Sequence, residues 1–216
     1  MATRRMVLLG AGGAAVGAAH PSWGAAAEYW PDATDWATLA PEAAGVDPSQ
    51  LKAAVDAAMA DNSNDVLVLR GGRIIAEAYA AGSGPEKTQE IASAAKSVVS
   101  CLVGMCIDQG KIKGVEQSAS DFIPQWKGTP KAAITIRHLL TMTSGLEFRG
   151  LAVRGITGDQ LAINAAAPVA FSPGAHWAYS TPMYHLLFHV IEKAAGEAFE
   201  AYAQKNLIGP LGMKDT

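Results

Sequence analysis

Apolar and polar positions follow a strand-like pattern in one short part of the chain. Two β-rich runs, Val66 to Arg70 and Arg73 to Tyr79, flank the two glycines Gly71 and Gly72. Strand-forming runs joined by a two-residue glycine turn are typical of a β-hairpin, so the pattern predicts one over residues 66–79. A sheet of two strands is marginally stable by itself, and the hairpin is therefore expected to need further partners.

Helical signals dominate the rest of the chain. Asp47, Pro48 and Gln50 provide an N-cap, a first-turn proline and a glutamine three residues after the cap, which predicts a helix ending near Asp61. Further helices are predicted at 93–109, near 135–141, at roughly 157–166, at 181–195 and at 197–207. The helix at 93–109 is apolar nearly all round and is expected to be buried and central.

The first residues have the pattern of an export signal. Arg4 and Arg5 precede the apolar stretch 6–19, and three alanines at 25–27 offer a cleavage site. The paired arginines predict a twin-arginine signal peptide over 1–27 and a periplasmic or secreted protein without a stable membrane anchor after cleavage. Residues 28–45 show no clean period and are predicted to form an extended arm, and the main domain is placed at 46–216.

A glycine pattern inside this signal imitates a dinucleotide-binding turn. Residues 7–9 are apolar, and residues 10–15 read Gly-Ala-Gly-Gly-Ala-Ala. Such a unit needs a full helix and a second strand within about 30 residues, whereas Pro21, Trp23 and Pro31 interrupt both. We therefore predict no nucleotide cofactor.

Composition excludes several other classes of protein. The chain has 216 residues, of which half are hydrophobic, and a formal net charge of −3. This balance is typical of a globular protein, and without a basic block we expect no nucleic-acid partner. Cys101 and Cys106 are expected on different helix faces, which disfavours a disulfide between them. The sequence has no zinc-binding spacing of cysteines and histidines.

Ser93 and Lys96 are the first candidates for chemistry. They lie three residues apart at the start of a predicted helix and so share one face. At a helix N-terminus the serine's backbone N–H lacks an intrahelical partner and can point at an oxyanion. A lysine in a largely desolvated site spends time neutral and can then accept the serine proton during attack.

Two other groups of polar residues have simpler explanations. His185 and His189 are four residues apart, but Leu186 stands where a zinc protease has its glutamate, and no third ligand is evident, so no metal site is predicted. Ser144, followed by Gly145, is interpreted as the end of a short helix. His138 and Arg137 are expected to bind nearby loops through hydrogen bonds.

Three segments in order resemble a known superfamily. They are Ile91 to Ser97 with the Ser-x-x-Lys pattern, Ile134 to Leu146, and Ser172-Pro173-Gly174 followed by Tyr179-Ser180-Thr181. The sequence resembles the serine β-lactamase and penicillin-binding-protein superfamily, in particular its class C-like branch, which includes esterases and 6-aminohexanoate-dimer hydrolases. The resemblance covers about residues 45–216. It implies a β-lactamase/transpeptidase-like α+β fold with a helical domain beside an antiparallel sheet.

The resemblance also implies roles for individual residues. Ser93 would be the acylated nucleophile, Lys96 its activating base, and Tyr179 the residue that passes a proton to the leaving group and helps to activate water. A lysine cation nearby favours the phenolate form of a tyrosine, which is consistent with that role.

Two substrate-binding residues are predicted beside Tyr179. The family has asparagine where this chain has Thr181, and a threonine cannot present an amide carbonyl and NH₂ together. This difference favours esters or other small acyl compounds over β-lactams and peptide amides. Trp177 is expected to line the acyl pocket or to pack nearby. The expected partner is a small-molecule acyl substrate.

The family's third motif, Lys-Thr-Gly or His-x-Gly on a later strand, has no counterpart after Tyr179. We therefore expect a C-terminally truncated chain that lacks the last sheet strands and one oxyanion-hole donor. Two functions stay open on the sequence alone: a serine hydrolase acting through an acyl-serine on an ester, amide or lactam, and a catalytically incompetent fragment or non-catalytic ligand-binding remnant of the same family.

Overall fold

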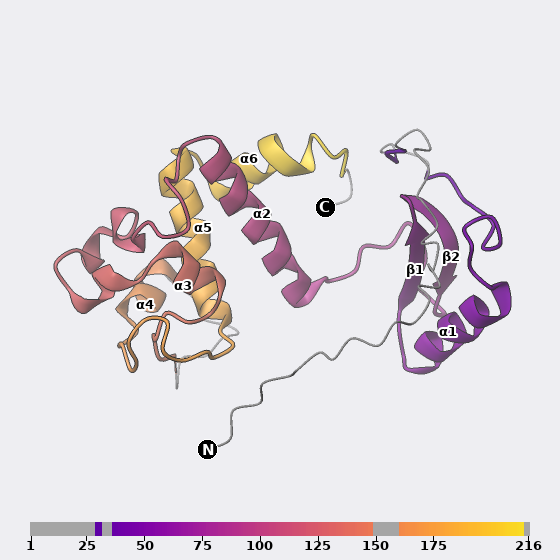
Figure 1. Cartoon of the computed structure of the whole chain (residues 1–216), viewed down its shortest axis with the longest axis horizontal. Coiled ribbons are helices and arrows are strands. Elements are labelled where there is room, and N and C mark those ends of the chain that lie inside the picture. Colours follow the sequence, from indigo (N-terminus) through magenta and orange to yellow (C-terminus); the bar gives the residue numbers. More distant parts are fainter. Residues whose placement is uncertain (1–28, 32–35, 149–159, 214–216) are drawn as a thin grey trace, which may run out of the picture.

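The computed structural model describes residues 29–31, 36–148 and 160–213, and its elements form two groups. Figure 1 shows a hairpin with one helix as the first group and the remaining helices as the second, with the segment 80–91 running between them. The predicted export signal and its glycine pattern lie outside the described residues. The combination of a helical body and a short antiparallel sheet agrees with the predicted fold class.

The first group consists of α1 (Pro48–Ala60), β1 (Asp65–Arg70) and β2 (Arg73–Tyr79). The Asp47 side chain accepts from the backbone N–H groups of Ser49 and Gln50, so the predicted N-cap is present. The strands pair antiparallel, and Gly71 and Gly72 both have positive φ, +56° and +77°, as a two-residue hairpin turn requires. The predicted helix and hairpin are thus confirmed.

Part of the predicted arm pairs with this hairpin. Leu39 N donates to Ile74 O at 2.8 Å, and Ile74 N donates to Ala37 O at 2.9 Å, which places this stretch parallel to β2. The apolar side chains of β1 gain little cover from it, since Leu67 and Leu69 remain 51% and 41% exposed. Among the described residues the sheet consists of these two strands. The expectation that it needs further strands or packing partners for stability therefore still holds.

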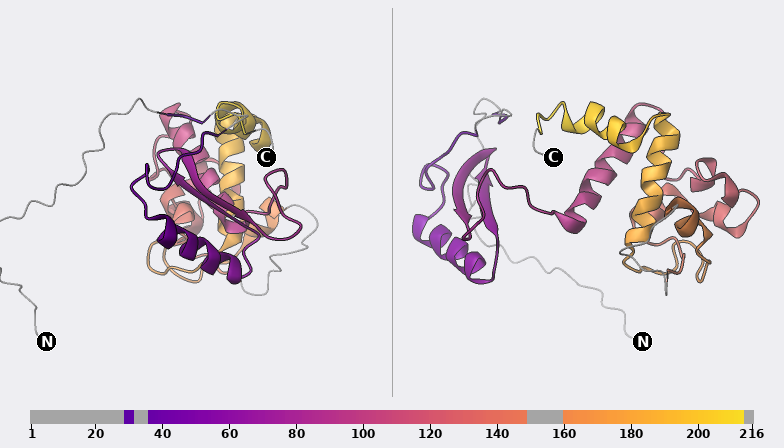
Figure 2. Two further views of the ribbon diagram at one scale, coloured as in Figure 1. Left: turned by 90° about the vertical axis from the view of Figure 1, so that its right-hand side faces the viewer. Right: turned by 180° about the vertical axis from the view of Figure 1, so that it is seen from behind.

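The second group is built around α2 (Ala95–Asp108) and α5 (Thr181–Ala195), which pack against each other (Figure 1). The helices α3 (Ile136–Leu140), α4 (Gln160–Ala166) and α6 (Phe199–Ala203) lie against α5. Figure 2 shows the same arrangement from two further directions. The core is contributed mainly by α2 and α5, with fully buried side chains including Leu102, Leu186, Leu187 and Ile191.

The helix α2 is buried along one face only, which corrects the expectation of an all-round buried helix. Val99, Leu102, Val103 and Cys106 face the core, whereas Cys101 is exposed. The packing partners of α2 among the described residues, chiefly α5, lie on that one side. The two cysteines are free and lie in different environments, as their spacing predicted.

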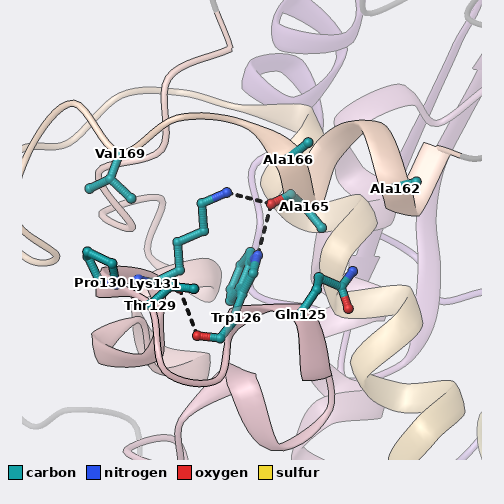
Figure 3. Close-up of a pocket in the computed structure, with 9 residues that line it drawn as sticks. All are labelled: Gln125, Trp126, Thr129, Pro130, Lys131, Ala162, Ala165, Ala166 and Val169. Carbon is teal, nitrogen blue, oxygen red and sulfur yellow. Dashed lines mark hydrogen bonds between the residues drawn. The ribbon is translucent and has the colours of Figure 1, made fainter.

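Short turns between α2 and α3 hold the end of α4 in place (Figure 3). The buried indole of Trp126 donates to Ala165 O at 2.9 Å, and Lys131 Nζ donates to the same carbonyl at 2.7 Å. A carbonyl in the last turn of a helix has no intrahelical donor, so both groups satisfy it. These residues border a pocket of about 700 Å³, and burial lowers the pKa of Lys131.

None of the helices that the structure describes has the length and apolar character to span a bilayer.

Truncation of Leu187, a core side chain on α5, tests how much this packing contributes to the stability of the fold. We expect Leu187→Ala to lower the free energy of unfolding by about 2–5 kcal/mol, because Leu187 is fully buried and its loss leaves a cavity. Leu211→Ala is the matched control, since Leu211 is 63% exposed and should change stability little. Urea unfolding followed by circular dichroism measures both, and equal effects of the two substitutions would contradict the packing described.

Candidate active site

Ser93 and Lys96 lie at the start of α2. Residues 92–94 form a 3₁₀ turn that leads directly into the helix, and Lys96 is its second residue. Lys96 Nζ donates to Ser93 Oγ at 3.2 Å. The pair predicted from the three-residue spacing is therefore in direct contact, with the serine exposed to solvent.

The residue before the serine has an unusual backbone conformation. Ala92 has φ +43°, a left-handed value that residues with a Cβ rarely adopt. Such a conformation costs on the order of 1 kcal/mol and is found preferentially where function requires it. An alanine gives no signal of positive φ, so the sequence did not reveal this feature.

Tyr179, in the loop before α5, and Thr181, the first residue of α5, complete the group. The hydroxyl groups of Tyr179 and Ser93 share a hydrogen bond, and Lys96 Nζ donates to Thr181 Oγ1 at 3.4 Å. Lys96 Nζ also lies 5.1 Å from the centroid of the Tyr179 ring. The tertiary structure thus brings four of the five predicted site residues together, across more than 80 positions of sequence.

Three titratable rings near Lys96 have shifted pKa values. Hydrogen bonds from Ser93 and then Lys96 hold the pKa of Tyr179 below its ordinary value. Burial raises the pKa of Tyr184, whose ring centroid lies 5.7 Å from Lys96 Nζ. Burial, followed by the Lys96 charge, lowers the pKa of His185, so the neutral imidazole is favoured next to the site. Tyr179 is the one of these groups that is shifted toward its anionic form.

Backbone hydrogen bonds between two loop segments hold Tyr179 in position. Gly174 N donates to Thr143 O at 2.8 Å, and Ala178 N donates to Met142 O at 3.2 Å. Ala170 N donates to Gly145 O at 2.9 Å. The family-like segment after α3 therefore forms a cradle for the loop that carries Tyr179, which we call the tyrosine cradle (142–147 and 168–178).

The serine of the tyrosine cradle is structural. Ser144 is fully buried, accepts from Leu146 N at 3.2 Å and donates to Met183 Sδ at the same distance. Ser180 caps α5 by accepting from Met183 N, and its own N–H contacts Met142 Sδ at 3.3 Å. The interpretation of Ser144 as a turn residue is consistent with these contacts, but the sequence missed that this turn positions the tyrosine.

His138 also supports this region without taking part in the reacting group. It forms a capping box with Thr135 at the start of α3, in which His138 Nδ1 accepts from Thr135 N at 3.1 Å. Arg137 forms an ion pair with Glu116. Hydrogen bonding to loops was the predicted role for these two residues.

A pocket of about 470 Å³ opens beside Tyr179 and Thr181. Its buried floor comes from Met142, Leu146 and Met183. Trp177 is not among its lining residues and is 61% exposed, so the predicted role of Trp177 in substrate binding stays a prediction.

Within the described part of the chain, no group of three or more His, Cys, Asp or Glu side chains could hold a metal ion. His189, one of the two histidines considered for zinc, lies 3.8 Å from Glu192 on the same helix. The reacting group at Ser93 is built from hydroxyl groups and an amine.

Comparison with known proteins identifies the family to which this chain belongs. The family model described as Beta-lactamase matches residues 50–216, and the chain belongs to this family. It is 28% identical over 214 residues to esterase EstB of Burkholderia gladioli, covering 83% of this chain and 54% of that protein. It is 32% identical over 138 residues to penicillin-binding protein 4* of Bacillus subtilis (strain 168), covering 59% of this chain and 30% of that protein.

Solved structures support the fold. A class C β-lactamase superposes with a TM-score of 0.63 at 23% identity, covering 78% of this chain and 51% of that one. A D-alanine carboxypeptidase from Burkholderia cenocepacia gives a TM-score of 0.62 at 21% identity, covering 78% and 50%. The chain spans about half the length of these proteins. The chain therefore belongs to the β-lactamase family and shares the fold of these structures.

A substitution at Gly145 tests whether the tyrosine cradle matters. A Cβ on Gly145 would lie 2.0 Å from Phe171 O, and its φ of +75° disfavours any side chain. We expect Gly145→Ala to lower the free energy of unfolding by about 2 kcal/mol or more and to reduce acylation of Ser93, because the loop carrying Tyr179 must shift.

The matched control is Gly104→Ala on α2, where an added Cβ meets nothing within 4 Å. This change replaces a helical glycine by alanine and should stabilise the protein by about 1 kcal/mol without changing the rate of acylation. Urea unfolding and adduct formation are measured on both variants. A Gly145→Ala protein with unchanged stability and acylation would show that the cradle does not position Tyr179.

Proposed function

We propose that this chain cleaves esters through a covalent acyl-Ser93 intermediate. The observation that carries the proposal is the joint contact of Ser93 Oγ with Lys96 Nζ, at 3.2 Å, and with the Tyr179 hydroxyl. A serine is a poor nucleophile until a neighbouring group accepts its proton, and this arrangement supplies two such groups.

The proposed acylation step uses this geometry. Ser93 Oγ attacks the ester carbonyl carbon and passes its proton to the Lys96–Tyr179 pair. The new bond joins Oγ to the acyl carbon, and the bond from that carbon to the alcohol oxygen breaks. Tyr179 then gives a proton to the departing alkoxide, so that the alcohol leaves neutral.

Deacylation uses the same groups in reverse. A water molecule gives a proton to Tyr179 as it attacks the acyl carbon, the bond to Ser93 Oγ breaks, and the serine recovers its proton. The scheme needs only the side chains and water, and it calls on no metal or organic cofactor. The backbone N–H of Ser93 is the proposed first donor to the oxyanion.

Thr181 supports esters as the substrate class over amides and lactams. Its Oγ1 accepts from Lys96 Nζ at 3.4 Å and so helps to orient the amine. A hydroxyl group offers less to a substrate amide than the carboxamide found at this position in the family. The similarity to esterase EstB supports the same choice. We further propose, from the pattern of residues 1–27, that the substrate is met outside the cytoplasm.

Acylation is tested by the intact mass of the full chain after reaction with a fluorophosphonate. We expect one adduct per chain on the parent, no adduct on Ser93→Ala, and a rate at least about 100-fold lower on Lys96→Ala, because the amine accepts the serine proton. Ser100→Ala is the matched control: it is an exposed serine on the same helix whose hydroxyl donates to Ser97 O, and it should react like the parent.

The same experiment separates the enzyme from a ligand-binding remnant of the family. A burst of one equivalent of alcohol per chain from an activated ester requires the acyl-serine and contradicts a purely binding role. No adduct on the folded parent chain would overturn the proposed function.

The pH dependence of Tyr179 provides a second test. Because its pKa is lowered, the phenolate forms below the ordinary value of about 10, whereas the pKa of Tyr184 is raised and that of Tyr79 is raised to about 12 by its hydrogen bond to Glu77. We expect the rate of acylation to rise with pH and to reach half its maximum below pH 10.

Ultraviolet absorbance identifies the group responsible. A phenolate component should appear below pH 10 in the parent and be missing from Tyr179→Phe, while Tyr79→Phe leaves it in place. A Tyr179→Phe profile that matches the parent would contradict the assignment.

A further inference from the structure

The amine of Lys96 is held at the site without an ion pair. In the part of the chain that the structure describes, no Asp or Glu carboxylate pairs with it. The amine donates instead to the hydroxyl oxygens of Ser93 and Thr181, at 3.2 and 3.4 Å, which are long distances for such bonds. A lysine side chain is flexible and loses much rotamer freedom when it is fixed. Other contacts must therefore help to keep the amine beside Ser93.

Tyr184 makes such a contact from α5. Thr181 and Tyr184 lie three residues apart on this helix and so share one face. The centroid of the Tyr184 ring lies 5.7 Å from Lys96 Nζ, within the distance at which the face of an aromatic ring attracts a cation. The side chain is 9% exposed, and this attraction is stronger where water is excluded.

The hydroxyl group of Tyr184 fixes the other end of the ring. It donates to Leu140 O at 3.0 Å. Leu140 is the last residue of α3, where a carbonyl group has no intrahelical donor. Tyr184 thus connects the end of α3, two residues before the tyrosine cradle begins, with the amine of Lys96 on α2.

We infer that Tyr184 is a positioning residue whose ring holds the Lys96 amine beside Ser93 and Tyr179. The inference deepens the proposed function, on which its consequence for the reaction rests. The position of the amine can be tested without the reaction, because Lys96 also acts on the ionisation of Tyr179.

A tyrosine elsewhere in the core provides a matched control. Tyr202 on α6 is fully buried, and its hydroxyl group donates to Gln109 Oε1 at 3.2 Å. Tyr202→Leu therefore removes a buried ring and one hydrogen bond, as Tyr184→Leu does, but away from the Ser93 group. Tyr184→Phe is the second control, since it keeps the ring and removes only the hydroxyl group.

The first test follows the ionisation of Tyr179 by ultraviolet absorbance, with the spectrum of the matching Tyr179→Phe chain subtracted. In Tyr184→Leu the amine of Lys96 is free to move away, so it supports the phenolate less. We expect the midpoint of Tyr179 to rise toward the ordinary value of about 10. Tyr184→Phe and Tyr202→Leu should keep the parent's midpoint.

The other titratable side chains around Tyr179 are the same in all these variants. They are Glu147 and His176 at the adjoining pocket, and His185 on α5. A double-mutant cycle shows whether Tyr184 acts through the amine. In a Lys96→Ala chain, the additional change Tyr184→Leu should leave the Tyr179 midpoint where Lys96→Ala alone places it.

The second test measures the rate of acylation by a fluorophosphonate. We expect Tyr184→Leu to react about tenfold more slowly than the parent, which is the effect of losing one cation–π contact shielded from water. Tyr184→Phe should react within about twofold of the parent, because its ring still faces the amine. In the Lys96→Ala chain, Tyr184→Leu should cause no further loss.

A series of fluorinated phenylalanines at position 184 makes the same test with little change in packing. One, two or three fluorine atoms nearly preserve the shape of the ring but withdraw electrons from its face, which weakens its attraction for a cation. We expect the Tyr179 midpoint to rise, and the rate of acylation to fall, stepwise with the number of fluorine atoms. This series decides the question if Tyr184→Leu does not fold.

The outcomes separate the inference from the proposed function. An unchanged Tyr179 midpoint in folded Tyr184→Leu, an equal rise in Tyr202→Leu, or a flat fluorine series overturns the role of Tyr184 and leaves acyl-Ser93 chemistry in place. A parent chain that forms no adduct overturns the proposed reaction, whereas a midpoint that follows the fluorine series still supports the role of Tyr184 in holding the amine.

Discussion

The packing of α2 against α5 is the contact on which the site depends. Ser93 directly precedes α2 and Lys96 is in its first turn, while Tyr179 directly precedes α5 and Thr181 is its first residue. The two helices must therefore meet with these ends together. The fully buried Leu102, Leu186 and Leu187 supply the apolar surface of this contact. The burial of apolar side chains thus brings the proposed nucleophile next to the groups proposed to activate it.

Packing of two helices positions their axes but leaves the loop before α5 free to move. The tyrosine cradle removes that freedom with backbone hydrogen bonds to Met142, Thr143 and Gly145. In the proposed reaction, groups held in this way need little rearrangement to reach the transition state, which lowers its cost. Met142 and Leu146 of the cradle also line the adjoining pocket, so the cradle positions the tyrosine and shapes this pocket as well.

The hairpin group contributes less to this site than the helices do. Its strands retain exposed leucines, and Figure 1 shows it beyond the start of α2. In the structures with the same fold, the matching region covers about half of the chain. The described part of the chain brings Ser93, Lys96 and Tyr179, the residues predicted from the family resemblance, into contact, and it holds a sheet of two strands.

The sequence by itself determined the local features: the Asp47 cap, the Gly71–Gly72 turn and the one-face spacing of Ser93 and Lys96 each depend on residues within a few positions of one another. The resemblance to the family added Tyr179 and Thr181 to the predicted site. No local sequence pattern could have indicated that these residues lie next to Ser93. The left-handed Ala92, the one-sided burial of α2, the tyrosine cradle and the apolar pocket were decided only by the tertiary structure. Each of these arises from contacts between segments far apart in the chain, where packing and backbone hydrogen bonds outweigh local preference.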